Sequence, residues 1–226
     1  MARLRFRYQT IEFGDEDIHV RSLRDLQEFA DADGAAEALG ISSARWSLFG
    51  VLWDAGYVLA HLMARYDVGE RSVLEIGSGL ALASLVLNRR GVDVTASDRH
   101  PEAGAFLAVN TELNDDAPIP FHRVSWVDDD TDLERFDMII ASDVLYEDHH
   151  AADLARFMLE HAAPDCEIIV VDGGRKQRRS LDARLADAGF VHDELEIRDG
   201  DFPGERFRGR THRYRRGAMV PDAGPT

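Results

Sequence analysis

Hydrophobic residues recur along this chain in two patterns, one with the period of a strand and one with the period of a helix. Apolar or alternating segments predict seven strands, at residues 73–76, 92–96, 121–126, 136–141, 167–171, 191–198 and 205–215. Segments with apolar residues at helical spacing lie between them, at residues 81–89, 102–113, 150–161 and 180–188. Because several strands are nearly continuous apolar runs, we expect a mainly parallel sheet covered by helices on both faces.

The two ends of the chain depart from this alternation. No helix is predicted between the last two strands, which indicates an antiparallel pair at a sheet edge. Residues 4–23 alternate on both sides of Gly14, as a β-hairpin does, and residues 24–39 and 46–66 have helical patterns. The pattern predicts a Rossmann-like, doubly wound α/β fold: a mainly parallel seven-stranded sheet, an antiparallel C-terminal edge pair, and an N-terminal hairpin with helices.

We divide the chain into three parts on this basis. Residues 1–45 are the N-terminal hairpin and helix extension, residues 46–216 form one α/β domain, and residues 217–226 are a flexible tail. Composition agrees with a globular protein, because 45% of the residues are hydrophobic.

Charge and cysteine content narrow the classes of function. The chain has 42 acidic and 26 basic residues, a net charge of -16, which argues against a nucleic-acid partner. It has neither a long apolar run nor a signal-like start, so we expect a cytoplasmic protein without membrane contact. Cys166 stands alone, and His149 and His150 have no third ligand nearby, so no metal site is predicted. The oligomeric state is not indicated.

Basic residues nevertheless gather in two places, at residues 175–179 and 206–216. Such clusters form either solvated faces or docking surfaces, and both interpretations remain open here.

The segment Val73-Leu-Glu-Ile-Gly-Ser-Gly79 leads from a strand through two glycines toward a helix. Gly77 and Gly79 allow a sharp turn, and the free N–H groups of the following helix would face a ligand, as in nucleotide sites. A dinucleotide fingerprint needs glycine or alanine at position 82, which is Leu82. The Gly-Lys-Ser/Thr of a phosphate-binding loop is also missing, so another nucleotide is expected.

Two acidic residues favour S-adenosylmethionine as that nucleotide. Asp98 follows Gly77 by 21 residues, at the strand end where a carboxylate accepts hydrogen bonds from ribose hydroxyls. Glu75 lies inside an apolar strand, where a carboxylate is costly unless it meets a cation or a donor. The ammonium of S-adenosylmethionine is such a cation, and a structural salt bridge is the alternative.

The motifs resemble those of class I, seven-β-strand S-adenosylmethionine-dependent methyltransferases. The resemblance rests on Val73–Gly79, on Ala96-Ser-Asp98 and on Phe136-Asp-Met-Ile-Ile-Ala-Ser-Asp-Val-Leu-Tyr146. Asp143-Val-Leu-Tyr146 is similar to the D-x-x-Y signature of the protein-lysine methyltransferase subgroup. Segments after Asp98 are most similar to the branch that methylates the β subunit of electron transfer flavoprotein.

The resemblance implies roles for individual residues. Glu75, Gly77, Ser78 and Gly79 would hold the methionine end of the cofactor, and Asp98 its ribose. The remaining cofactor-binding candidates, toward the adenine or closing over the cofactor, are Trp53, Arg99, Ser125, Trp126 and Ser142. For Trp53 and Trp126, core packing is an equal alternative.

Asp143 and Tyr146 are the catalytic candidates. Asp143 would orient a substrate amine and stabilise its growing charge, and Tyr146 would offer an aromatic face or a hydroxyl acceptor. We therefore predict an N-methyltransferase acting on a lysine-bearing protein. A small-molecule N-methyltransferase and a non-catalytic protein that retains the fold are the alternatives.

Overall fold

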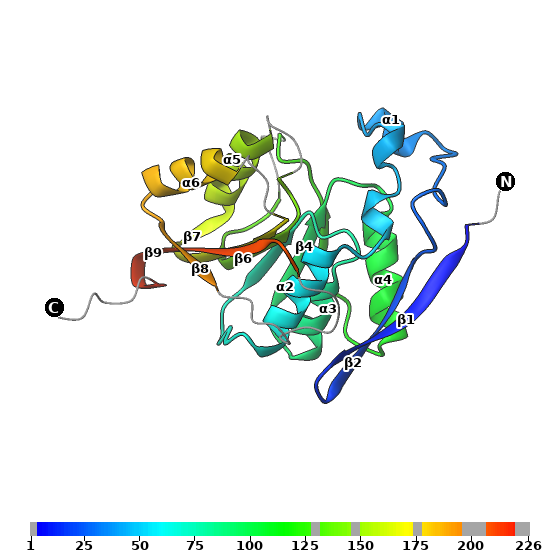
Figure 1. Cartoon of the computed structure of the whole chain (residues 1–226), viewed down its shortest axis with the longest axis horizontal. Coiled ribbons are helices and arrows are strands. Elements are labelled where there is room, and N and C mark those ends of the chain that lie inside the picture. Colours follow the sequence, from blue (N-terminus) through cyan, green and yellow to red (C-terminus); the bar gives the residue numbers. More distant parts are fainter. Residues whose placement is uncertain (1–3, 128–131, 146–149, 174–177, 196–206, 220–226) are drawn as a thin grey trace.

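The computed structural model describes residues 4–127, 132–145, 150–173, 178–195 and 207–219. They form a layered α/β body with a separate N-terminal hairpin (Figure 1). The sheet has seven strands in the order β5-β4-β3-β6-β7-β9-β8. Their bounds are β3 (Val73–Ile76), β4 (Val94–Asp98), β5 (Phe121–Arg123), β6 (Phe136–Ser142), β7 (Ala162–Asp172), β8 (Val191–Leu195) and β9 (Arg210–Arg216).

The strand directions confirm the predicted sheet. Strands β3 to β7 pair in parallel, and β9 runs antiparallel to both of its neighbours, β7 and β8. The last strand of the chain therefore lies inside the sheet, and β8 is the edge. Because β3 lies between β4 and β6, the order of strands reverses at β3, where parallel sheets bind ligands beyond their carboxyl ends.

Helices cover both faces of the sheet, as predicted (Figure 1). One core cluster includes Leu59, Leu85 and Leu107. These belong to α2 (Asp54–Arg65), α3 (Leu82–Arg89) and α4 (Ala103–Leu113). The other cluster includes Phe157 and Leu185, from α5 (His150–His161) and α6 (Arg178–Asp187).

The predicted N-terminal hairpin is confirmed. Strands β1 (Phe6–Phe13) and β2 (Glu16–Leu23) pair antiparallel around Gly14, whose φ is +76°. The helix predicted over residues 24–39 is wrong, because only α1 (Ala35–Ala38) forms there. Polar side chains bond to the backbone instead, as when the two carboxylate oxygens of Asp31 accept the N–H groups of Ala36 and Glu37.

The apolar stretch Ser43–Arg65 is long and apolar enough, by length and composition, to cross a membrane. It consists of two 3₁₀ turns, η1 (Ser43–Arg45) and η2 (Leu48–Gly50), followed by α2. Half of its most apolar window is buried inside the fold. The helical prediction for residues 46–66 is thus confirmed only from Asp54 onward.

Arginines of the basic segment 206–216 are paired within the fold. Arg210 pairs with Glu194 at 2.7 Å, and both Arg213 and Arg215 pair with Asp193. These ion pairs join β9 to β8, so Arg210, Arg213 and Arg215 serve the sheet edge. Residues 175–177 of the other basic cluster, and Arg206, lie outside the described residues.

The first residues of the predicted tail have structure. Gly217–Met219 form the 3₁₀ turn η3, and the N–H of Ala218 donates to Asp165 Oδ1 at 2.8 Å. Residues 220–226 lie outside the described residues.

Candidate active site

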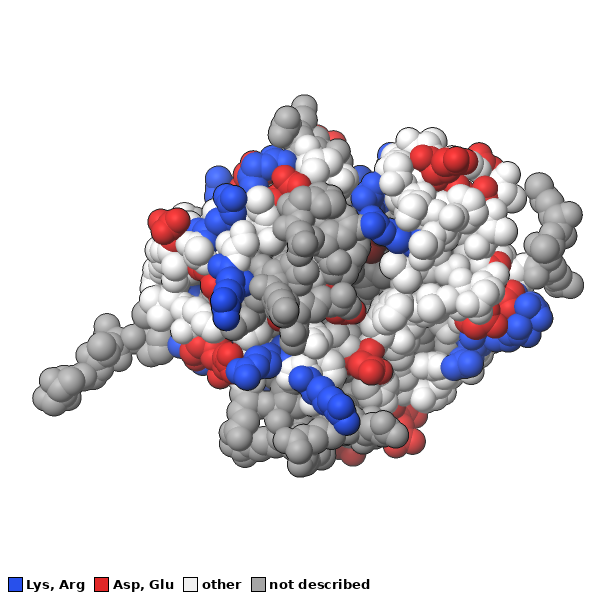
Figure 2. Space-filling view, turned by 45° about the horizontal axis from the view of Figure 1, so that its top comes forward, with Lys and Arg blue, Asp and Glu red and all other residues white. Residues whose placement is uncertain are grey.

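A cavity of about 400 Å³ opens at the carboxyl ends of β3, β4 and β6. Figure 2 shows the molecule hollowed near its centre, with basic side chains beside the hollow. The cavity brings together every predicted site residue that the structure describes, namely Trp53, Glu75, Gly77, Ser78, Gly79, Asp98, Arg99, Ser125, Trp126, Ser142 and Asp143. Tyr146 lies outside the described residues.

The turn after β3 needs its glycines for two reasons. Gly77 and Gly79 have φ values of +62° and +54°, which L side chains rarely adopt. A Cβ on Gly77 would lie 2.9 Å from Val144 Cγ1, and one on Gly79 would lie 3.2 Å from the carbonyl oxygen of Phe49. Ala81 also has a positive φ, +55°, which costs an alanine about 1 kcal/mol. The backbone here is therefore specialised to pass close to a ligand.

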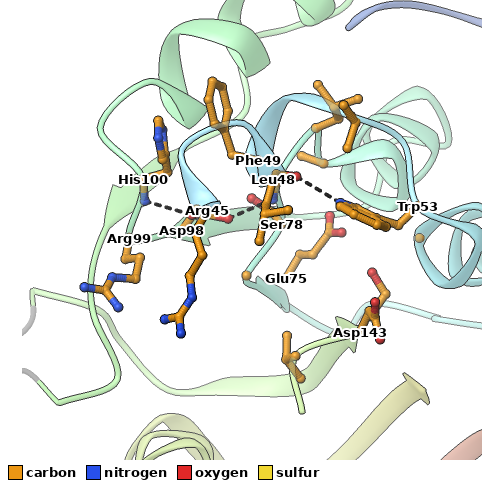
Figure 3. Close-up of a pocket in the computed structure, with 18 of the residues that line it drawn as sticks. Arg45, Leu48, Phe49, Trp53, Glu75, Ser78, Asp98, Arg99, His100 and Asp143 are labelled. Atoms are coloured by element: carbon orange, nitrogen blue, oxygen red, sulfur yellow. Dashed lines mark hydrogen bonds between the residues drawn. The ribbon is translucent and has the colours of Figure 1, made fainter. Parts of the chain in front are cut away.

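Asp98 ties the glycine turn to the end of β4. Its Oδ2 accepts the N–H of Gly79 at 2.9 Å, and its Oδ1 accepts the N–H of His100 at 2.8 Å (Figure 3). Burial raises the pKa of Asp98, and the backbone N–H donors oppose that rise. Each carboxylate oxygen can accept a second hydrogen bond, so the side chain suits the predicted ribose hydroxyls.

Glu75 is 2% exposed and finds its donor in α3. Its Oε2 accepts both the N–H of Ser84, at 2.9 Å, and the Ser84 hydroxyl. No salt bridge to Glu75 occurs among the described residues, so the salt-bridge alternative has no support there. Burial raises the pKa of Glu75 to about 7 because it disfavours the charged form. A nearby cation would stabilise that charged form.

We expect Glu75→Gln to stabilise the ligand-free protein at pH 8 by on the order of 2 kcal/mol. The folded protein holds the Glu75 proton more tightly than the unfolded chain. Its stabilising contribution is therefore present below pH 4.5 and lost as the pH rises through about 7. Urea unfolding at pH 5 and pH 8 measures the difference, with the exposed Glu112→Gln as control. An equal gain at both pH values would contradict this account.

The hydroxyl of Ser78 is buried at the cavity and has no hydrogen-bond partner among the described residues. Figure 3 shows the side chain of Ser78 near Asp98. A buried hydroxyl without a partner is costly, so this donor suits a polar ligand such as the predicted amino-acid end.

The two tryptophans differ in their surroundings. Trp53 is 39% exposed, and its Nε1 donates to the carbonyl oxygen of Leu48 at 2.9 Å (Figure 3). Core packing is therefore wrong for Trp53. Trp126 packs against the core cluster of β6 and α5, and it also lies 3.5 Å from a Cβ position on Gly77. Trp126 thus serves both the core and the cavity wall.

Asp143 follows β6 with a φ of +52°, a conformation that aspartate and asparagine tolerate better than most residues. Its N–H donates to the carbonyl oxygen of Val171 at 2.9 Å, which fixes the residue to the end of β7. Strained backbone of this kind is typical of functional sites.

Sequence reasoning missed part of the cavity wall. Phe49 stacks on His100 with ring centroids 3.8 Å apart, and both line the cavity (Figure 3). Burial lowers the pKa of His100 to about 4, so the ring is neutral near pH 7. Further lining residues that were not predicted include Ile41, Arg45, Leu48 and Asp153. The position of His100, two residues after Asp98, was the available signal.

A model of the lysine methyltransferase family matches residues 39–187. The electron transfer flavoprotein β-subunit lysine methyltransferase of Danio rerio is 28% identical over 66% of this chain and 58% of its own length. Protein N-lysine methyltransferase METTL21A of Xenopus tropicalis is 30% identical over 59% of this chain and 66% of its own length. The chain thus spans less than two thirds of either relative.

The name of another relative gives arginine, and not lysine, as the residue that is methylated. Histone-arginine methyltransferase METTL23 of Xenopus laevis is 28% identical over 70% of this chain and 71% of its own length.

Solved structures agree on the fold. The ribosomal protein L11 methylase of Lactobacillus delbrueckii subsp. bulgaricus aligns with a TM-score of 0.56 and 25% identity, over 70% of this chain and 77% of that one. Magnesium protoporphyrin IX methyltransferase of Synechocystis, solved with bound SAM, aligns at 0.53 and 19%, over 71% and 76%. From the family match and the site at the ends of β3, β4 and β6, we conclude that the chain belongs to the lysine methyltransferase family.

Proposed function

We propose that this protein transfers a methyl group from S-adenosylmethionine to a lysine side chain of a protein substrate. One observation carries the proposal: the glycine turn, Asp98 and Asp143 come from three strand ends and line a single cavity. Membership of the lysine methyltransferase family supports the same reaction.

The residues present suit the cofactor from end to end. The buried Ser78 hydroxyl and the Glu75 carboxylate offer a donor and an acceptor to an amino-acid group, and Asp98 offers two acceptor oxygens to a ribose. Trp126 and Arg99 line the cavity where the adenine would lie. When bound, S-adenosylmethionine supplies a methyl group on a positively charged sulfur.

Methyl transfer to an amine is an in-line displacement, so the protein mainly aligns the amine and excludes water. A lysine amine must arrive neutral and becomes positive as the new C–N bond forms. The Asp143 carboxylate would accept a hydrogen bond from the amine and stabilise this positive charge. Because its backbone is fixed to Val171, Asp143 can hold that position without rearrangement.

The chemical identity of the methyl acceptor can be tested directly. A carboxylate would also suit a guanidinium or a small-molecule amine, and one relative is named a histone-arginine methyltransferase. We would incubate the protein with methyl-labelled S-adenosylmethionine and a lysate from cells that lack it, separate proteins from small molecules, and map the label by mass spectrometry. Label on lysine supports the proposal. Label on arginine or on a small molecule refutes it, and absent cofactor binding indicates a non-catalytic protein.

A further inference from the structure

Asn110 of α4 and Asn114, the residue that caps the C-terminal end of α4, bond to β2 as a neighbouring strand would. Asn110 accepts the N–H of Arg21 at 2.8 Å and donates to the Arg21 carbonyl oxygen at 3.2 Å. Asn114 makes the same pair of bonds with His19, both at 2.8 Å. Four residues of helix rise about 6 Å, and two residues of strand rise about 7 Å, so one helix face matches one strand edge. We call these four bonds the asparagine clamp.

The clamp is buried. Asn110 is 0% exposed and Asn114 is 7% exposed. Their bonds satisfy backbone groups of β2 that would otherwise lie unpaired against α4, which would be costly. The clamp therefore fixes the position of the hairpin on α4. The hairpin itself lies outside residues 39–187, the part of the chain that the family model matches.

A continuous set of contacts leads from the clamped hairpin to the cavity. Leu23 is the last residue of β2. Its Cδ1 lies 2.5 Å from the position that a Cβ on Gly50 would occupy, so Leu23 and Gly50 are in close contact. Phe106 of α4 packs edge-on against Phe49, with centroids 5.0 Å apart, and the guanidinium of Arg21 lies 4.9 Å from the Phe106 ring.

Phe49 is the point where these contacts reach the cofactor site. Its carbonyl oxygen lies 3.2 Å from a Cβ position on Gly79, and its ring stacks on His100. Both Gly79 and His100 donate their N–H groups to Asp98. A displacement of Phe49 would therefore alter the cavity wall at both the glycine turn and Asp98.

We propose that Asn110 and Asn114 are positioning residues for the cofactor cavity. By fixing the hairpin they hold Phe49 against the glycine turn, so the cavity is preorganised before the cofactor binds. The inference rests on the proposed function, because it concerns binding of S-adenosylmethionine. Preorganisation affects affinity, and Asp143 takes no part in the contacts described from the hairpin to Phe49. Loosening the clamp should weaken cofactor binding and leave turnover at saturation unchanged.

The test compares Asn110→Leu and Asn114→Leu with Thr111→Val, a buried residue of the same helix whose hydroxyl bonds within α4. Titration calorimetry with S-adenosylmethionine and with its demethylated product, S-adenosylhomocysteine, gives affinities without turnover. We expect about tenfold weaker binding in the two asparagine variants, a higher KM for the cofactor, and kcat within twofold. Hydrogen exchange should quicken at the Arg21 amide in Asn110→Leu and at the His19 amide in Asn114→Leu, and Thr111→Val should change neither measurement.

The outcomes separate the two proposals. If the asparagine variants fold and exchange faster at β2 but bind the cofactor within twofold of the original protein, the positioning role is refuted. A loss of kcat without a change in affinity would refute it as well. If the original protein binds no cofactor, the proposed function fails instead. If Asn110→Leu does not fold, Asn114→Leu still tests the proposal, because Asn114 is more exposed and its replacement should destabilise the fold less.

Discussion

Replacing Asp143 with asparagine is expected to slow methyl transfer at least about 100-fold at saturating cofactor and substrate, with cofactor affinity within about twofold. The amide keeps the size of the carboxylate but removes the charge that would stabilise the methylated amine. Asparagine also tolerates the φ of +52°, whereas alanine would add backbone strain and confuse the result. Single-turnover kinetics measure the transfer step, and calorimetry measures the affinity.

Asp115→Asn is the matched control for this variant. Asp115 has a φ of +54°, nearly that of Asp143, but lies in the loop after α4 and does not line the cavity. We expect its turnover to match that of the original protein. If Asp143→Asn keeps its rate within a few fold, Asp143 does not stabilise the reacting amine, and the amine must be held by other groups.

Much of the sheet could be predicted from the sequence because its signals are local. The apolar runs around Ile76, Ile140 and Val170 belong to strands that are buried on both faces, so hydrophobicity alone revealed them. The helix predicted over residues 24–39 failed for the opposite reason. Its composition favours a helix, but Asp31 forms hydrogen bonds with the backbone of Ala36 and Glu37 and limits the helix to one short turn.

Some residues of the candidate site could likewise be predicted from the sequence, and others could not. The residues at or near the carboxyl ends of strands, such as Glu75 and Asp98, could be predicted because a parallel sheet brings these ends together. Phe49 could not be predicted, since it belongs to an apolar segment that reads as a core helix. Its place at the cavity depends on Leu23, which contacts the neighbouring Gly50, and on Phe106; both Leu23 and Phe106 are distant in sequence and lie on other elements.

The role of the basic strand β9 could not be predicted for a related reason. From sequence, Arg213 and Arg215 fit a solvated face or a docking surface, because their partner Asp193 is about 20 residues away. Strand pairing places Asp193 directly opposite Arg213. Cross-strand ion pairs of this kind depend on register, which composition does not give.

Replacing Gly77 with alanine is expected to weaken S-adenosylmethionine binding at least about 100-fold, equivalent to about 2.7 kcal/mol. The new methyl group would meet Val144 Cγ1 at 2.9 Å and Trp126 at 3.5 Å. Val144 is 3% exposed and β-branched, so it has little freedom to move aside. The turn would have to open, which would displace the backbone that faces the ligand. Calorimetry with S-adenosylhomocysteine measures the loss.

Gly69→Ala separates crowding from backbone strain. Gly69 has the same φ, +62°, but a Cβ there would meet nothing within 4 Å. We expect this control to lose about 1 kcal/mol of unfolding free energy and to keep its affinity. If both variants lose equal stability and both bind normally, the close packing around Gly77 does not serve the cofactor. If only Gly77→Ala loses binding, the methyl-sized space at Gly77 is what admits the ligand.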